Sequence, residues 1–155
     1  MNIVLIEPQI PQNTGNIGRL CAATSTPLHL VGKLGFKTDD KALKRAGMDY
    51  WKRLDITYYE CFDEFQKRND NGNFYFLSTK GGHTYSQISF IKGDYLIFGS
   101  ETKGLPGNLL ERFKNNTIRI PMIKETRSLN LSSSVSIVLY EALRQNNFIN
   151  YQPCL

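Results

Sequence analysis

The sequence predicts an α/β domain, with a mostly parallel sheet and helices on both faces. Short runs rich in β-branched and aromatic residues alternate with helical segments along the whole chain of 155 residues. Such alternation is typical of parallel strands joined by helices. Hydrophobic residues make up 41% of the chain and charged residues 21%, which is enough for a core and disfavours disorder or a rod. We expect one domain over residues 1–155.

The first elements follow from apolar runs and breaking residues. Asn2–Glu7 and Leu28–Val31 are predicted strands because both are short and apolar. Gly15–Thr24 is a predicted helix between them, with Asn13 or Thr14 as its cap. After them, Lys41–Ala46 is expected to form a short polar helix or turn.

The middle of the chain repeats this alternation. Ile56–Tyr59 is a predicted strand of β-branched and aromatic residues, and Phe62–Arg68 is a predicted helix. Two further strands, Phe74–Ser78 and Tyr95–Gly99, are expected on either side of a polar loop that contains Gly81 and Gly82.

The last third ends in the longest helix. Pro106–Phe113 is a predicted helix with proline near its first turn, and Thr117–Ile120 is a strand closed by proline. Leu131–Gln145 follows as a helix whose core-facing residues are Leu131, Val135, Val138, Leu139 and Ala142. A second stripe could be a solvent face or a surface that a ligand or partner approaches: Ser132, Ser136, Tyr140 and Arg144. The polar tail 146–155 is expected to fray.

Charge and targeting features point to a cytoplasmic protein that could bind nucleic acid. No apolar run approaches the ~20 residues of a membrane span, and the start lacks the basic region of a signal peptide. The odd set Cys21, Cys61 and Cys154 indicates free thiols. The segment Lys33–Arg53 holds seven basic and three acidic residues, which is +4 of the net +5. A polyanion would suit this segment, although a solvated surface explains it as well.

Several familiar sites are excluded. His29 lies in a predicted strand as a packed or edge residue, and His83 lies in a glycine-rich loop, so neither a hydrolase triad nor a metal site has enough ligands. The segment from Gly99 to Gly104 lacks the Lys-Ser/Thr of a phosphate loop, and no dinucleotide fingerprint occurs. We expect no metal.

Three polar segments are candidates for a binding site. The first, residues 11–19, runs into a helix and carries Arg19, which gains nothing from the dipole at a helix N-terminus. The other two, residues 99–106 and 120–132, follow buried strands. Open α/β sheets bind ligands at the carboxyl ends of their strands, so these loops are expected to form a site together.

The same segments resemble the three motifs of the SPOUT superfamily of RNA methyltransferases. The matching residues are Asn13-x5-Arg19, Phe98-Gly-Ser-Glu-Thr-Lys-Gly-Leu-Pro106, and Ile120-Pro-Met122 with Ser128-Leu-Asn-Leu-Ser132 and Leu139-Tyr-Glu-Ala142. The opening strand and Arg45-Ala-Gly-Met-Asp-Tyr50 are similar to the single-domain TrmL branch. That branch methylates the ribose 2′-oxygen of the wobble nucleotide, a cytidine or modified uridine, in leucine tRNAs. The resemblance covers residues 2–146.

The resemblance implies a C-terminal trefoil knot, which general connection rules would not predict. It also implies S-adenosyl-L-methionine as cofactor, a homodimer whose two chains complete the active site, and the anticodon stem-loop as RNA partner. The implied cofactor-binding residues are Leu77, Gly99, Ile120, Ser128 and Leu129. Glycine allows close backbone approach, and leucine and isoleucine can wall an adenine.

The polar motif positions Asn13, Arg19, Glu101 and Asn130 are the candidate catalytic residues. Arg19 suits a phosphate or alkoxide, and Glu101 could hold Asn13 or Arg19 by charge-assisted hydrogen bonds. Asn130 could fix its loop or simply cap the last helix. The candidate RNA-binding residues are Arg127, Lys41, Lys44 and Arg45.

Other functions stay open at this point. The chain could be a non-catalytic RNA-binding dimer of the same fold, or a 2′-O-methyltransferase that acts on another RNA position. A different small nucleotide-dependent enzyme is disfavoured because the phosphate fingerprints are missing.

Overall fold

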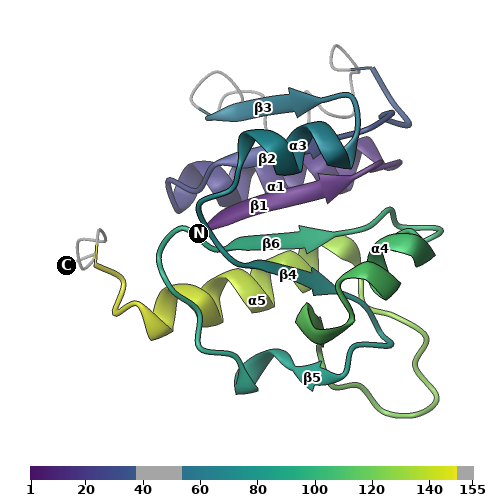
Figure 1. Ribbon diagram of the computed structural model, residues 1–155, viewed down its shortest axis with the longest axis vertical. Coiled ribbons are helices and arrows are strands. Elements are labelled where there is room, and N and C mark those ends of the chain that lie inside the picture. Colours follow the sequence, from purple (N-terminus) through teal and green to yellow (C-terminus); the bar gives the residue numbers. More distant parts are fainter. Residues whose placement is uncertain (38–53, 150–155) are drawn as a thin grey trace.

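The computed structural model describes residues 1–37 and 54–149. They form a seven-stranded sheet of order β3-β2-β1-β6-β4-β7-β5, in which every strand pair is parallel (Figure 1). The strands are β1 (Asn2–Ile6), β2 (Leu28–Val31), β3 (Ile56–Tyr59), β4 (Phe74–Leu77), β5 (His83–Thr84), β6 (Tyr95–Phe98) and β7 (Thr117–Arg119). The predicted parallel α/β sheet is confirmed.

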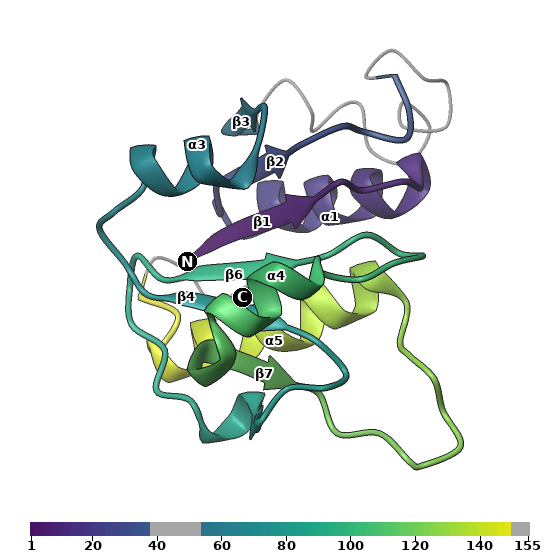
Figure 2. The same ribbon diagram turned by 45° about the vertical axis from the view of Figure 1, so that its right-hand side comes forward.

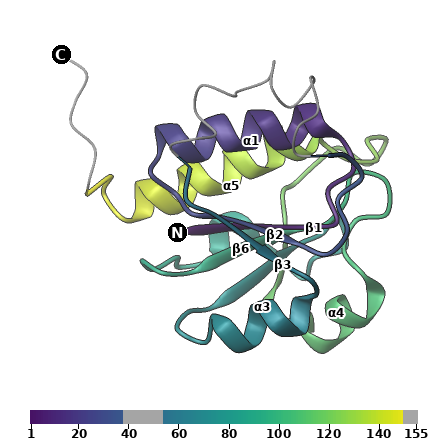
Figure 3. The ribbon, with the colours of Figure 1, turned by 90° about the horizontal axis from the view of Figure 1, so that it is seen from above.

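Helices cover both faces of the sheet (Figure 3). Helices α1 (Pro11–Ala23) and α5 (Leu131–Gln145) pack side by side on one face. Helices α3 (Phe62–Arg68) and α4 (Gly107–Arg112) lie on the other face. Short 3-10 turns η1 (Tyr85–Gln87) and η2 (Lys114–Asn116) complete the described elements.

The strand order reverses direction at the centre of the sheet. The chain moves outward through β1, β2 and β3, and then crosses to β4 on the far side of β1. Strand β6 returns between β1 and β4, so that Leu5 and Leu77 both align with Phe98. Parallel α/β sheets bind ligands where the order reverses, beyond the carboxyl ends of the strands. Figure 2 shows the long loop after β7 passing this edge before α5 begins.

Two hydrophobic layers hold the helices on the sheet. The layer under α1 and α5 contains Ile17, Val135 and Leu139, all fully buried. The opposite layer is aromatic and includes Phe65 and Phe76, also fully buried. Each such side chain contributes about 1.5–3 kcal/mol through burial.

The buried His29 belongs to the aromatic layer, so its prediction as a packed residue is confirmed. Its Nδ1 lies 3.0 Å from the hydroxyl of Tyr59, and its Nε2 is buried without a hydrogen-bond partner among the described residues. Burial lowers the pKa of His29 to about 4. The imidazole is therefore neutral at physiological pH.

Several element boundaries differ from the prediction. Helix α1 begins at Pro11, four residues early, with Ile10 as its N-cap, so Asn13 and Thr14 are buried helical residues and not caps. Proline suits the first helical position because its missing N–H would have no partner there. Strand β5 and turn η1 occupy part of what was expected to be loop, and they place the exposed His83 beside β7.

The chain is tied down where the expected tail begins. The side chain of Asn146 donates to the Phe90 carbonyl at 3.0 Å and caps α5.

Cys21 and Cys61 are free thiols, and burial raises the pKa of Cys21 to about 12. The expected turn at Lys41–Ala46, as well as Cys154, lies outside the described residues.

Candidate active site

A cavity of about 610 Å³ lies beyond the carboxyl ends of β4, β6 and β7. Its walls are partly apolar and partly polar, and the loops that follow these strands supply most of its lining. Its volume is within the ~300–1,000 Å³ typical of small-molecule sites. All five residues expected to bind a cofactor line it: Leu77, Gly99, Ile120, Ser128 and Leu129.

The loop after β6 is closed tightly on itself. The backbones of Ser100 and Gly104 exchange two hydrogen bonds of 2.9 and 3.2 Å, and the Ser100 hydroxyl accepts from the Lys103 N–H. A Cβ added to Gly99 would lie 2.1 Å from the Gly104 carbonyl carbon. Glycine is needed at position 99 because the backbone of the same loop packs against it. From the sequence, a ligand was expected to make this close approach.

Glu101 joins this loop to the start of α1. Its carboxylate accepts from the backbone N–H groups of Gln9 and Ile10 at 2.8 and 3.2 Å, and from the side-chain amide of Asn13 at 3.0 Å. Of the two partners expected for Glu101, the structure brings it to Asn13. Arg19 lies almost two turns further along α1 than Asn13.

Asn130 performs both of the roles weighed for it. Its Oδ1 accepts from the N–H groups of Ser132 and Ser133 and so caps α5. Its Nδ2 donates to Oδ1 of Asn13 at 3.0 Å. Asn13 thus lies between Glu101 and Asn130, and one hydrogen-bonded chain ties all three motifs together at the cavity.

Arg19 lies apart from these groups. It is an exposed residue of α1, six residues after Asn13, which is about 9 Å along the helix axis. It does not line the cavity. The structure therefore brings together three of the four candidate catalytic residues within one chain.

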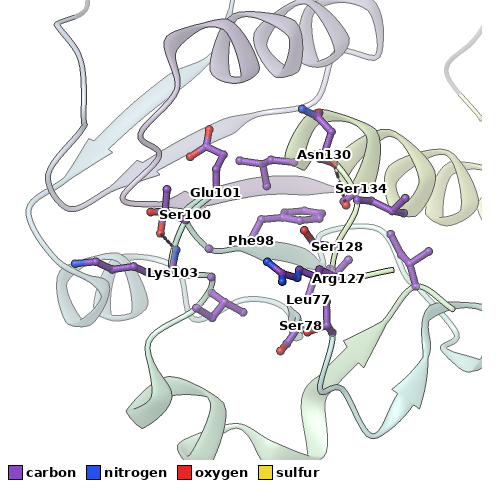
Figure 4. A pocket seen from close by; sticks show the side chains of 18 of the residues that line it. Leu77, Ser78, Phe98, Ser100, Glu101, Lys103, Arg127, Ser128, Asn130 and Ser134 are labelled. Carbon is purple, nitrogen blue, oxygen red and sulfur yellow. Dashed lines mark hydrogen bonds between the residues drawn. The ribbon is translucent and has the colours of Figure 1, made fainter. Parts of the chain in front are cut away.

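Of the candidate RNA-binding residues, Arg127 lines the cavity and its side chain points into it (Figure 4). Lys41, Lys44 and Arg45 lie outside the described residues. The cavity also contains residues that the sequence did not single out, among them Ile10, Ser78, Lys80, Lys103 and Ser134. Ser78 and Lys80 follow β4, so the rule that ligands bind at strand ends could have found them.

Within residues 1–37 and 54–149 there is no group of three or more His, Cys, Asp or Glu side chains placed to hold a metal ion. In the same part of the chain, no helix has the length and apolar character needed to cross a membrane.

Comparison with known proteins identifies the family. The model of the SpoU rRNA Methylase family matches residues 1–140. The chain belongs to the SpoU methylase family. The resemblance to RNA methyltransferases of the SPOUT type is thereby confirmed.

Curated SpoU methylase relatives match over almost their full length. A Listeria monocytogenes protein is 52% identical over 150 residues, which are 95% of this chain and 89% of the relative. An Escherichia coli K12 protein, named tRNA (cytidine(34)-2′-O)-methyltransferase, is 47% identical over 94% of this chain and 93% of the relative. A Saccharophagus degradans protein of the same name is 48% identical over 95% and 96%.

Solved structures match the SpoU methylase fold closely. One, from work on 2-OH methylation of C/U34 on tRNA, is 41% identical, has a TM-score of 0.90, and aligns over 95% of this chain and 96% of its own. An AdoMet-bound rRNA methyltransferase from Sinorhizobium meliloti is 26% identical with a TM-score of 0.82. The match covers 92% of this chain and 55% of that larger one.

Proposed function

We propose that this protein transfers a methyl group from S-adenosyl-L-methionine to the ribose 2′-oxygen of the wobble nucleotide, a cytidine or modified uridine, in leucine tRNAs. The observation that carries the proposal is the cavity at the carboxyl ends of β4, β6 and β7, where Glu101, Asn13 and Asn130 form one hydrogen-bonded chain. The names of the Escherichia coli and Saccharophagus degradans relatives support the tRNA substrate and the reaction.

The residues that line the cavity fit this cofactor. Leu77, Ile120 and Leu129 offer apolar contact to an adenine ring, and Ser128 offers a hydroxyl to its polar edge or to a ribose. When bound, the cofactor supplies an electrophilic methyl group on a sulfonium sulfur. An AdoMet-bound relative of the same fold supports this assignment.

The reaction requires a ribose hydroxyl held in line with the methyl group while its oxygen gains negative charge. The chain from Glu101 to Asn130 fixes the loop after β6 against the start of α5, and so fixes the cavity walls. Arg19 stays protonated, because a guanidinium does so in proteins. It binds the phosphate beside the reacting ribose and stabilises the developing alkoxide, while the phosphate or a water takes the proton.

A homodimer would bring Arg19 to a reacting ribose. Arg19 does not line the cavity of its own chain, so a second chain is the simplest source of this group. Helices α1 and α5 lie side by side on one face and could form the interface (Figure 3). On α5, Ile137 is 36% exposed and Tyr140 is 49% exposed, which is apolar surface that a partner chain would cover.

Mixing two impaired variants tests the shared site. If Arg19 acts on the partner's cavity, a heterodimer of Arg19→Ala and Asn130→Asp chains contains one intact cavity with an intact arginine opposite it. Random pairing then restores about a quarter of wild-type activity. Light scattering gives the oligomeric state of the same samples. An active monomer, or no recovery in the mixture, contradicts the shared site.

Mass spectrometry of ribose methylation in tRNA from cells with and without the gene tests the reaction and its target. We expect the 2′-O-methyl group at the first anticodon position of leucine tRNAs to disappear with the gene. The enzyme would then act in the cytoplasm on the anticodon stem-loop. Loss of the mark at another RNA position would support a related methyltransferase, and unchanged methylation would support a non-catalytic RNA-binding dimer.

The trefoil knot also belongs to this proposal. Strand β7 pairs with β4 on one side of the sheet, and the chain then returns along the cavity edge to α5, which packs on α1 (Figure 2). A threaded C-terminal segment requires that this return passes through the loop after β6. An experimental structure traced through residues 99–131 would test the threading.

A further inference from the structure

The charges that line the cavity are unbalanced. Three cations line it, Lys80, Lys103 and Arg127, against one carboxylate, that of Glu101. Among the described residues, none of the three cationic side chains makes an ion pair. Glu125 lies on the same loop as Arg127 but does not line the cavity.

Glu101 offsets only one of these three cations. Its two carboxylate oxygens accept three hydrogen bonds, from Gln9 and Ile10 just before α1 and from Asn13 in the first turn of that helix. Arg127, in contrast, points into the cavity (Figure 4). The lining carries three positive charges against one negative charge, so a ligand in the cavity experiences a net positive field.

We infer that this cavity distinguishes its two cofactor forms by the charge on their sulfur atom. Neutral S-adenosylhomocysteine binds more tightly than cationic S-adenosylmethionine, and Arg127 is the main residue that determines this preference. The inference rests on the proposed cofactor. In the transfer, the methyl carbon leaves sulfur for the ribose oxygen, sulfur keeps the bonding electron pair and becomes a neutral thioether, and the hydroxyl proton passes to the neighbouring phosphate or a water. The two ligands share their carboxylate, amine and adenosine, so the ratio of their affinities isolates the sulfonium charge.

Transfer thus removes a positive charge from a site that disfavours it. The field raises the free energy of the bound substrate cofactor more than that of the transition state, in which the sulfonium charge is already being neutralised. The same field retains the product. Arg127 consequently acts on the cofactor, in addition to any contact with RNA.

Calorimetry with each ligand alone, on the full-length protein without RNA, tests this. For the wild-type protein we expect S-adenosylhomocysteine to bind about 3–10-fold more tightly, the range for one unit charge at several ångströms in a partly solvated site. Arg127→Gln should bring the two affinities to within about 2-fold, and Arg127→Lys should keep most of the difference. Lys124→Gln, on the same loop but outside the cavity, is the matched control and should leave the ratio unchanged.

A salt series on the wild-type protein gives a second readout that needs no variant. Raising ionic strength should reduce the preference for the neutral ligand, because screening weakens the repulsion. Equal or tighter binding of S-adenosylmethionine, or an unchanged ratio in Arg127→Gln, overturns the inference. Equal weakening of both ligands in that variant means that Arg127 binds their shared carboxylate, which also overturns it. If neither ligand binds the wild-type protein, the proposed cofactor itself is wrong.

Discussion

Asn130 donates a hydrogen bond of 3.0 Å to Asn13 across 117 residues of sequence. The same side chain caps α5 through its oxygen. One amide group therefore links the start of α5 to the first turn of α1. Because an amide has one donor end and one acceptor end, the cap and the link use opposite ends of Asn130. The two roles can therefore be separated by substitution.

Asn130→Asp should keep the cap and lose the link. Aspartate caps helices as well as asparagine does, so we expect the free energy of unfolding to change by less than about 0.5 kcal/mol. A carboxylate cannot donate to Asn13, and its oxygen would face that of the Asn13 amide. Single-turnover methylation should fall about 10–10²-fold, because the cavity loops lose their alignment. Asn130→Ala, which loses both roles, should also unfold about 1 kcal/mol more easily. A normal rate in Asn130→Asp would show that the link is dispensable.

Gly99→Ala should damage the cavity. The added Cβ would lie 2.1 Å from a backbone carbon of Gly104, so the loop must shift. Such overpacking costs about 1–3 kcal/mol in unfolding free energy, and cofactor affinity should be lost. Gly82→Ala is the matched control, since a Cβ there meets nothing within 4 Å. Calorimetry and denaturant unfolding on both variants measure the difference, and normal cofactor binding by Gly99→Ala would contradict the tight loop.

The buried His29 predicts a pH dependence of stability. Burial lowers its pKa to about 4 in the folded state, below the ordinary value of 6.5. The unfolded chain therefore binds the proton first as pH falls, so the stabilisation is complete above pH 6.5 and is lost progressively down to about 4. The loss amounts to about 3 kcal/mol. Unfolding of His29→Gln between pH 7 and 5 should have a shallower slope, and the exposed His83→Gln should keep the wild-type slope.

Local patterns predicted individual elements better than their arrangement. The bounds of β2, β3, α3 and α5 agree with the sequence prediction, because each has a clear apolar period and breaking residues at its ends. The burial of the Asn13 amide within α1 depends on Glu101, 88 residues further along the chain, which supplies its acceptor. Strand β5 is two residues long and exists because it pairs with β7. No local pattern contains either partner.

For the candidate site, too, the sequence predicted the individual loops better than the contacts between them. The rule that ligands bind at strand ends placed the loops after β6 and β7 correctly at one cavity. The pairing of Glu101 with Asn13 and not with Arg19 depends on how α1 is oriented, which the sequence of that segment does not specify. The insertion of β6 between β1 and β4 decides which loops meet, and this order is a property of the whole sheet.

Neutralising Lys41, Lys44 and Arg45 together should weaken RNA binding. The segment from Lys33 to Arg53 carries +4 of the net charge of +5, so it is the strongest candidate in the sequence for backbone phosphate binding. For every phosphate that is no longer neutralised, the slope of log affinity against log salt should fall by about 0.7–0.9. Binding measured over a salt series, with Lys92→Gln as a control outside this segment, gives that slope. An unchanged slope would mean that the segment does not touch RNA.

Arg19 should be the most sensitive single residue for turnover while leaving cofactor binding intact. It does not line the cavity of its own chain, so Arg19→Ala should bind S-adenosylhomocysteine with nearly wild-type affinity. Loss of electrostatic stabilisation at the developing alkoxide should lower the single-turnover rate about 10²–10³-fold. Arg19→Lys keeps the charge but loses the planar fork that matches a phosphate, so partial activity is expected. A general base would show a different pattern, because a lysine protonated at neutral pH could not substitute at all. If Arg19→Ala keeps most of its single-turnover rate with saturating RNA, the arginine takes no part in the chemical step, and the proposed interaction between Arg19 and the phosphate is wrong.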